Sequence, residues 1–178
     1  MERELESGIK IGVVHGDITA QEDVEAIVNA ANAELESGGG VAGAIHAAAG
    51  PGLTEEARPL APIGPGEAVI TSGHDLPNRY VIHALGPVYG RDHPEAELLA
   101  ECYRNSLTLA EDRGISSVAF PAISTVVFGY PKREAAEVAL RAVIEEAGSL
   151  RSVRLIRFVL FGEEDREIYE DTLARLLG

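Results

Sequence analysis

Short β-rich runs alternate with longer helical patterns along the whole chain of 178 residues. Apolar runs and alternations predict six strands, at residues 10–15, 26–29, 67–71, 80–84, 117–121 and 154–161. Apolar residues at helical spacing predict helices at residues 41–49, 94–112, 131–146 and 164–177. This alternation favours one α/β domain, in which helices cover both faces of an at least partly parallel sheet and binding loops follow the carboxyl ends of the strands.

Charge and cysteine content exclude several functional classes. Fifteen Lys and Arg side chains stand against 29 Asp and Glu side chains, a formal net charge of −14 that would repel nucleic acid, so bulk nucleic-acid binding is not expected. No apolar run approaches the roughly 18 residues of a membrane-spanning helix, and the charged start does not resemble a signal peptide, so we expect a cytoplasmic protein without a membrane partner. Cys102 is the single cysteine, and neither a disulfide nor a metal or cofactor is expected.

The first candidate binding loop follows the strand predicted at residues 10–15. Asp17 stands at the end of this strand, where its carboxylate can accept a hydrogen bond from an exocyclic amine such as that of adenine, although a turn-forming Asp is an equal alternative. Thr19 with Glu22 three residues later matches a capping box, so we interpret Thr19 as the N-cap of a helix.

The second candidate loop contains three successive glycines, Gly38, Gly39 and Gly40, directly before a predicted helix. Such a run lets backbone amides close on a bulky anion at the helix N-terminus, and a diphosphate would fit. A flexible surface loop is the structural alternative. The spacing of Gly38, Gly40 and Gly43 also matches a dinucleotide fingerprint, but residues 29–37 separate the strand from the first glycine, so a nicotinamide-dependent dehydrogenase is a distant alternative.

The third candidate loop follows the strand predicted at residues 117–121. Ser124 and Thr125 can donate hydrogen bonds to phosphate. Phe128 and Tyr130 are either ordinary core or rim aromatics or residues that flank a sugar, and Pro131 begins the next helix.

Taken together, these segments make the chain similar to a macrodomain, the ADP-ribose-binding module, over residues 16–177. The motifs that carry the resemblance occur in family order and spacing: Gly-Asp-Ile-Thr, Asn-Ala-Ala-Asn, Gly-Gly-Gly-Val, Val-Ile-His-x-x-Gly-Pro at residues 81–87, and Phe-Pro-Ala-Ile-Ser-Thr followed by Phe-Gly-Tyr-Pro. The resemblance implies a single macrodomain over residues 1–178, a three-layer α/β/α sandwich with a mixed, mostly parallel sheet of about six or seven strands. ADP-ribose would lie in a crevice across the top of this sheet.

The resemblance also implies three groups of ligand-binding residues. The adenine group contains Asp17, Ile18 and Phe161. The diphosphate group, which supplies mainly backbone amides, contains Gly39, Gly40, Val41, Ser124, Thr125 and Val127. At the distal ribose, Asn32 would bond the hydroxyls and Phe128 would stack nearby. Val126, Gly129 and Tyr130 complete the binding loop.

Two residues depart from the family pattern. Ala42 stands where hydrolases of the MacroD type carry an Asp that can orient the attacking water, although members with an aliphatic residue there are still thought to hydrolyse ADP-ribosyl esters. Val126 replaces the first Gly of Ser-Thr-Gly-Val-Phe-Gly. A β-branched residue there should clash with the ligand or strain the loop, at a cost of about 1 to 3 kcal/mol if the position needs a positive φ, so we expect reduced affinity.

The function implied is binding of ADP-ribose by a monomer, with hydrolysis of the ester that joins ADP-ribose to acidic side chains of modified proteins or to acetate. No activated nucleophile is evident, so a water positioned by Asn32 is the expected attacker. His46 is a second catalytic candidate, with a structural role as its alternative. A non-catalytic ADP-ribose reader and a phosphatase acting on ADP-ribose-1''-phosphate remain as alternative functions.

Overall fold

A seven-stranded sheet forms the centre of the molecule in the computed structural model, which describes residues 1–178. The strands lie in the order β1-β2-β7-β6-β3-β5-β4. Their bounds are β1 Glu2–Glu4, β2 Lys10–His15, β3 Ala26–Ala30, β4 Ala68–Ser72, β5 Tyr80–Ala84, β6 Ser117–Phe120 and β7 Leu155–Leu160. The five inner strands run parallel, and β1 and β4 are antiparallel edge strands, which confirms the predicted mixed sheet.

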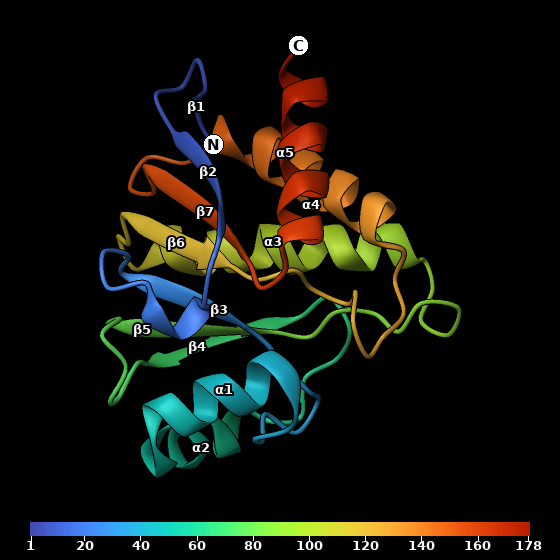
Figure 1. The fold of residues 1–178 in the computed structure, drawn as a ribbon. Helices are drawn as coiled ribbons and strands as arrows, with labels where there is room; N and C mark the ends of the chain where they lie inside the picture. The colour runs from blue at the N-terminus through green and yellow to red at the C-terminus, as the bar shows by residue number, and fades with distance from the viewer.

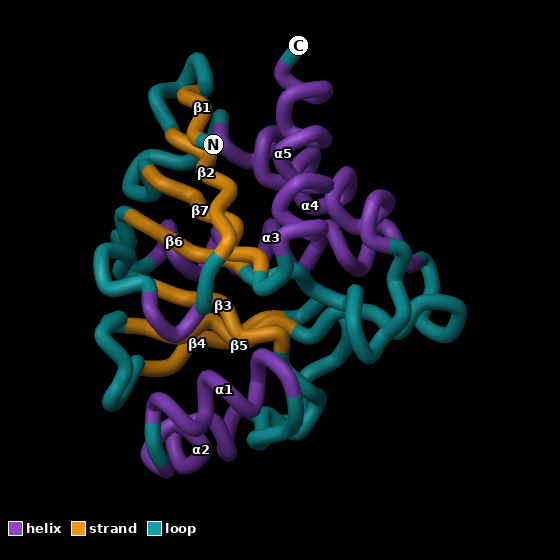
Figure 2. Tube along the Cα trace, in the orientation of Figure 1, coloured by secondary structure: helices purple, strands orange, loops and turns teal.

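Helices cover both faces of this sheet (Figure 1). The helices α1 (Gly40–Ala49) and α2 (Pro51–Ala57) lie on one face. The other face is covered by α3 (Glu95–Asp112), α4 (Lys132–Ala147) and α5 (Glu163–Leu177). Figure 2 shows the strands as a layer between these two groups of helices, so the three-layer α/β/α sandwich is confirmed. None of the helices combines the length and apolar character needed to cross a membrane.

Two elements were not predicted from the sequence pattern. The strand β1 has three exposed, charged residues and pairs with β2 through its backbone, so it carries no apolar signal. The helix α2 begins at Pro51 directly after α1 ends. Gly50 separates the two helices at φ +83°, and a proline at the first position of a helix loses no hydrogen bond.

The alternation of side chains along β3 divides the apolar interior into two layers. Ala26 and Val28 belong to the larger core, under α3, α4 and α5, whereas Ile27 packs in the smaller core under α1 and α2. The rings of Phe120 and Phe158 stack in the larger core with centroids 5.7 Å apart. Because both faces of the sheet are buried, ligand-binding residues can reach solvent only at the ends of the strands and in the loops that follow them.

A row of buried polar side chains crosses the sheet from β3 to β4. His83 on β5 accepts a hydrogen bond from Nδ2 of Asn29 at its Nδ1 atom (3.1 Å). Its Nε2 atom donates to the hydroxyl of Thr71 (3.0 Å), which donates to the carbonyl of Ser72 (3.1 Å). Burial, with a smaller contribution from nearby His46, lowers the pKa of His83 to about 3.

This buried histidine predicts a loss of stability on mild acidification. The unfolded chain binds a proton at its usual pKa of about 6.5, whereas the folded chain resists protonation down to about 3. Stability should therefore fall as the pH drops below about 6.5, by roughly 2 kcal/mol at pH 5. Burial also lowers the pKa of His46, which adds to the slope in the same direction. The measurement is denaturant unfolding between pH 7.5 and 5.

In the variant His83→Gln, the free energy of unfolding should depend less steeply on pH between 7.5 and 5, whatever the stability of the variant at pH 7.5. His93→Gln is the control, because the side chain of His93 is 62% exposed. An unchanged slope in His83→Gln would contradict the assignment.

Candidate functional site

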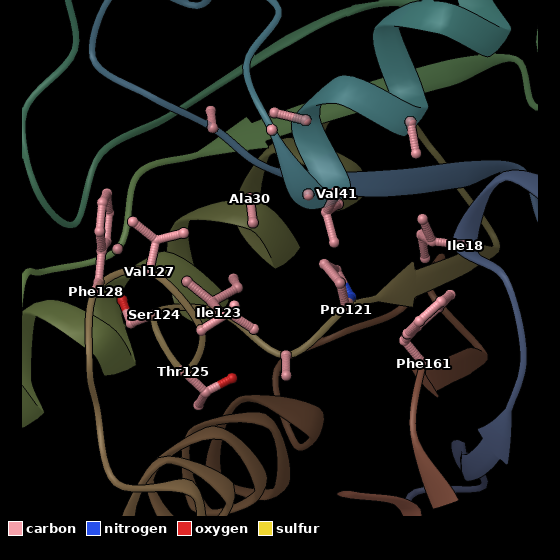
Figure 3. A pocket seen from close by; sticks show the side chains of 18 of the residues that line it. Ile18, Ala30, Val41, Pro121, Ile123, Ser124, Thr125, Val127, Phe128 and Phe161 are labelled. Atoms are coloured by element: carbon pink, nitrogen blue, oxygen red, sulfur yellow. The ribbon is translucent and has the colours of Figure 1, made fainter.

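A cleft of about 620 Å³ opens at the carboxyl ends of β2, β3, β6 and β7 (Figure 3). These four strands are consecutive in the sheet, in the order β2-β7-β6-β3, and run parallel, so the loops that follow them meet at one edge. The lining comes from five segments and three single residues: 16–18, 30–32, 38–42, 121–128, 159–161, Ala44, Gly86 and Asp165. Segments far apart in the sequence thus form one cavity.

Asp17 lies at one end of the cleft, where it caps a 3-10 turn, Ile18–Ala20. Its Oδ1 atom accepts from the hydroxyl (2.7 Å) and the backbone amide (2.8 Å) of Thr19. These two bonds lower the pKa of Asp17 below its ordinary value. The carboxylate therefore stays ionised and keeps Oδ2 available for a donor in the cleft. The interpretation of Thr19 as an N-cap was wrong, because Asp17 caps the turn from two residues earlier.

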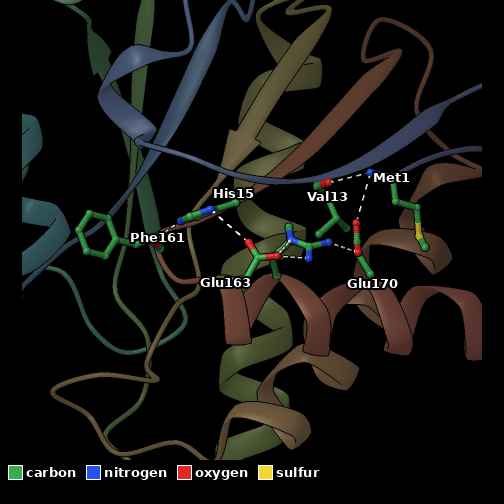
Figure 4. A network of polar contacts seen from close by, with 7 residues as sticks. Met1, Val13, His15, Phe161, Glu163 and Glu170 are labelled. Atoms are coloured by element: carbon green, nitrogen blue, oxygen red, sulfur yellow. Dashed lines mark hydrogen bonds and ion pairs between the residues drawn. The ribbon is translucent and has the colours of Figure 1, made fainter.

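Phe161 lies at the same end of the cleft as Ile18, and this residue is 88% exposed (Figure 3). Its backbone is fixed, because Nε2 of His15 donates to its carbonyl (2.9 Å). The other ring nitrogen of His15 lies 3.2 Å from the carboxylate of Glu163 at the start of α5 (Figure 4). A bare aromatic ring on a fixed backbone is suited to stacking against a planar group.

The polar contacts of Glu163 continue along α5 to the start of the chain (Figure 4). Arg166 pairs with both Glu163 and Glu170. Glu170 in turn lies 3.4 Å from the terminal amine of Met1, which donates to the carbonyl of Val13 on β2 (3.1 Å). The network joins α5 to β2, the neighbour of the strand β7 that leads to Phe161.

The glycine run forms one wall of the cleft. Gly39 is the N-cap of α1 in an extended conformation, and Gly40 adopts φ +59°, where a side chain would be strained. The amides in the first turn of a helix have no acceptor within that helix, and those of Gly40, Val41 and Ala42 have no other backbone partner. Val41 and Ala42 line the cleft beside them (Figure 3). The wall is thus a set of N–H groups free for an anion.

The same geometry excludes the dinucleotide fingerprint. Gly38, Gly40 and Gly43 do not form a tight strand-to-helix turn, because β3 ends at Ala30 and α1 begins only at Gly40.

The loop after β6 forms the opposite wall. Ser124 adopts φ +69°, and its hydroxyl oxygen is buried without a hydrogen-bond partner. Its carbonyl accepts from the amide of Tyr130 (2.9 Å), which closes the loop. Thr125, Val126 and Val127 follow on the cleft rim, with the two valine side chains 84% and 85% exposed. The loop therefore gives the cleft an apolar rim, while the Ser124 hydroxyl is buried behind it.

The strain expected at Val126 does not occur, because the positive φ angles of this loop fall at Ser124 and at Gly129 (φ +71°). Val126→Gly therefore has no strain to relieve. We expect it to weaken ADP-ribose binding by no more than about fivefold, through added flexibility of the free loop. Isothermal titration of both proteins checks this, and a clear tightening would contradict it.

Phe128 lies at the end of the cleft away from Ile18 and Phe161 (Figure 3), and Asn32 lines the cleft and the adjoining pocket together with Phe128. Asn32 closes its own loop, since its Nδ2 donates to the carbonyl of Glu36 (2.9 Å) and its Oδ1 accepts from the amide of Glu36 (3.0 Å). Phe128 is half-buried and lines the cavity wall (Figure 3).

Three of the proposed site residues do not line the cleft. Gly129 turns the chain, and Tyr130 is buried against Tyr89 with ring centroids 4.9 Å apart. His46 lies between α1 and α2, where its Nδ1 is 3.0 Å from the hydroxyl of Thr54. Its burial lowers its pKa, so it is a neutral packing residue away from the cavity. This position agrees with the structural alternative for His46, and its catalytic role stays an untested prediction.

The contributions of Gly86, Asp165 and His15 to the site were not predicted from the sequence. Gly86 forms the floor beneath Ser124, and a Cβ atom there would overlap the Ser124 hydroxyl and lie 2.6 Å from Cγ2 of Ile123. This glycine belongs to the motif Val-Ile-His-x-x-Gly-Pro, but the motif does not indicate that Gly86 makes room for Ser124. Asp165 lines the cleft from α5, and its carboxylate pairs with Lys132 (2.9 Å). His15 does not line the cleft, but it donates a hydrogen bond to the carbonyl of Phe161. Neither had a local sequence signal.

Comparison with known proteins gives the family. The family model of the Macro domain matches residues 28–139. The chain is 47% identical to a macro domain-containing protein of Chlorobaculum tepidum, over 96% of this chain and 99% of that protein. It is 50% identical to a Klebsiella pneumoniae protein named O-acetyl-ADP-ribose deacetylase, over 91% of this chain and 95% of that protein. The chain belongs to the macrodomain family.

Solved macrodomain structures agree in fold. A variant of the Oceanobacillus iheyensis macrodomain with ADPR superimposes with a TM-score of 0.94 at 41% identity, covering 99% of this chain and 98% of that one. The Trypanosoma brucei macrodomain in complex with ADP-ribose gives 0.85 at 37% identity, over 94% of this chain and 69% of that one. The macrodomain architecture thus extends over almost the entire chain.

Proposed function

We propose that this macrodomain binds ADP-ribose in the cleft and hydrolyses the ester that joins ADP-ribose to acetate or to acidic protein side chains. One observation carries the proposal: the free amides at the start of α1 and the loop that contains Ser124 line the same cavity from opposite walls. The relatives named O-acetyl-ADP-ribose deacetylase, at 47% to 50% identity, support the choice of reaction.

The electrostatics of the cleft suit an anion held without basic side chains. Its lining contains no Lys or Arg, and the chain carries a net charge of −14. Fixed N–H dipoles can neutralise a diphosphate in such a place, because they are already oriented toward it. The two ends of the cavity fit the remaining parts of the ligand, with Asp17 and Phe161 at the adenine and Asn32 and Phe128 at the distal ribose.

The chemistry proposed is attack by a positioned water. Cys102 is unavailable as a nucleophile, because burial raises the pKa of its thiol to about 12 and its Sγ atom lies 3.1 Å from the carbonyl of Leu85. In the reaction, the water oxygen bonds to the acyl carbon, the bond from that carbon to the ribose oxygen breaks, and a carboxylic acid and ADP-ribose leave. The second N–H group of Asn32 Nδ2, which the bond to Glu36 leaves free, would orient the water beside the ribose, so that the rate comes from positioning.

Two assays on the same preparation test the proposal. Isothermal titration with ADP-ribose should show saturable binding at one site. Incubation with O-acetyl-ADP-ribose, and with a protein ADP-ribosylated on glutamate, should release ADP-ribose with time. Absence of binding would refute the proposal as a whole.

A non-catalytic reader is the second candidate function. Ala42 favours it, because this residue lines the cleft without the carboxylate that MacroD-type relatives place there. Binding of ADP-ribose without release from either ester would establish the reader.

We also propose that the protein acts as a monomer on ADP-ribosylated proteins in a reducing compartment, the cytoplasm. The free, buried Cys102 suits such a compartment. Light scattering at assay concentrations tests the monomer, for which one mass near 18.9 kDa is expected.

A further inference from the structure

A second pocket of about 270 Å³ adjoins the cleft at its ribose end. Three residues line both cavities: Asn32, Gly86 and Phe128. Phe128 and Phe161 stand at opposite ends of the cleft, with Val41 and Pro121 between them (Figure 3). A group attached to the ribose at the Phe128 end would therefore point toward the second pocket.

The walls of this pocket are held by backbone hydrogen bonds. The amide of Tyr89 donates to the carbonyl of Phe128 (2.9 Å), which joins the turn at residues 88–92 to the Ser124 loop. On the other side, the amide of Ile63 donates to the carbonyl of Ala33 (3.0 Å). The pocket is thus formed before any ligand arrives, which lowers the entropic cost of filling it.

The polar side chains of the pocket are already used within the chain. Asn32 bonds the backbone of Glu36 through both of its polar atoms. Asp92 accepts from the amide of Val88 (2.8 Å) and pairs with Arg91, whose side chain is 74% exposed. The rest of the wall is apolar: Ala33, Ile63, Pro65, Leu85 and Val88.

We infer that this second pocket is an acyl subsite, which receives the hydrocarbon part of an ester carried on the distal ribose and favours three- and four-carbon acyl groups over acetyl. The inference rests on the proposed function and extends it to O-acyl-ADP-ribose as a substrate class. An uncharged acyl chain matches the five apolar residues of this wall, whereas the charged groups of Arg91 and Asp92 are paired with each other and the Arg91 side chain extends into solvent.

Binding of stable analogues tests the subsite independently of turnover. The probes are two amides of ADP-ribose, with an acetylamino or a butyrylamino group in place of a distal ribose hydroxyl, and ADP-ribose itself is the reference. Burial of two additional methylenes should make the butyryl analogue bind about tenfold more tightly than the acetyl analogue. Equal affinities would overturn the inference.

Two substitutions at one position sharpen this test. Val88→Phe fills the pocket and should abolish the preference for butyryl, while the affinity for ADP-ribose stays within about twofold. Val88→Ala enlarges the pocket and should extend the preference to a hexanoyl analogue. Val138→Phe makes the same change on α4, outside both cavities, and should leave the preference intact.

The outcomes separate the inference from the proposed function. Selective binding of the butyryl analogue without hydrolysis of any ester would refute the hydrolase and leave the subsite. Hydrolysis of acetyl and butyryl esters at equal efficiency, with no effect of Val88→Phe, would refute the subsite and leave the hydrolase. If Val88→Phe slows release only from a glutamate-modified protein, the pocket receives the protein instead of an acyl chain, and the inference is wrong.

Discussion

Replacing Gly86 with alanine is expected to weaken ADP-ribose binding by at least about a hundredfold, although Gly86 supplies no polar side chain to the ligand. The added Cβ would overlap the hydroxyl of Ser124 and lie 2.6 Å from Cγ2 of Ile123. Ser124 cannot yield easily, because it is buried at φ +69° and its carbonyl is bonded to Tyr130. The whole wall of the cleft must shift, and isothermal titration measures the consequence.

The control for this substitution is Gly148→Ala. Gly148 ends α4 at φ −63°, and a Cβ atom there would meet open space, so this variant should bind as the unaltered protein does. Melting temperatures of both variants establish that they are folded. If folded Gly86→Ala binds ADP-ribose within threefold of the unaltered protein, the role assigned to the Ser124 wall is wrong.

The second large effect is expected for Asn32→Ala, in turnover more than in binding. The substitution removes the group proposed to orient the water, and a misplaced water costs about a hundredfold in rate. It also removes both bonds to Glu36, so a loss of affinity of up to about tenfold is expected as the loop loosens. The rate of ADP-ribose release from O-acetyl-ADP-ribose and the affinity for ADP-ribose are measured separately.

Asn105→Ala is the matched control, because Asn105 makes a similar bond to the carbonyl of Gly66 (2.8 Å) but lies on α3, outside the cleft. Asn32→Asp retains an acceptor for the amide of Glu36 and should keep more affinity than Asn32→Ala. Full turnover by Asn32→Ala would show that Asn32 does not position the water.

The architecture could be predicted from the sequence because the inner strands are buried on both faces. Residues 10–15 and 80–84 were predicted with their observed bounds, since apolar burial leaves a continuous signal there. The strand β1 left no such signal, because only its backbone pairs with β2. The capping-box interpretation of Thr19 failed because a carboxylate two residues earlier captured both its amide and its hydroxyl.

The site was predictable where a motif is itself the cavity wall, as in the glycine run and the Ser124 loop. It was not predictable where a residue acts through the backbone of another segment. His15 fixes Phe161 across 146 positions of sequence, and Gly86 makes room for Ser124. His46 is the opposite case, since it was proposed for the site because it follows a binding loop in the sequence. Its side chain instead contacts Thr54 on the next helix, outside the cleft.

The amides at the start of α1 have a consequence for how such a site can vary. A peptide N–H is present at almost every residue, so no exchange of one side chain removes it, except exchange to proline. The contacts of these amides can therefore change only through the path of the main chain, which depends on Gly40 in its left-handed conformation and on the length of the loop before it. Over evolutionary time, the surface around such a site can therefore become as acidic as that of this protein while the amides continue to bind a diphosphate.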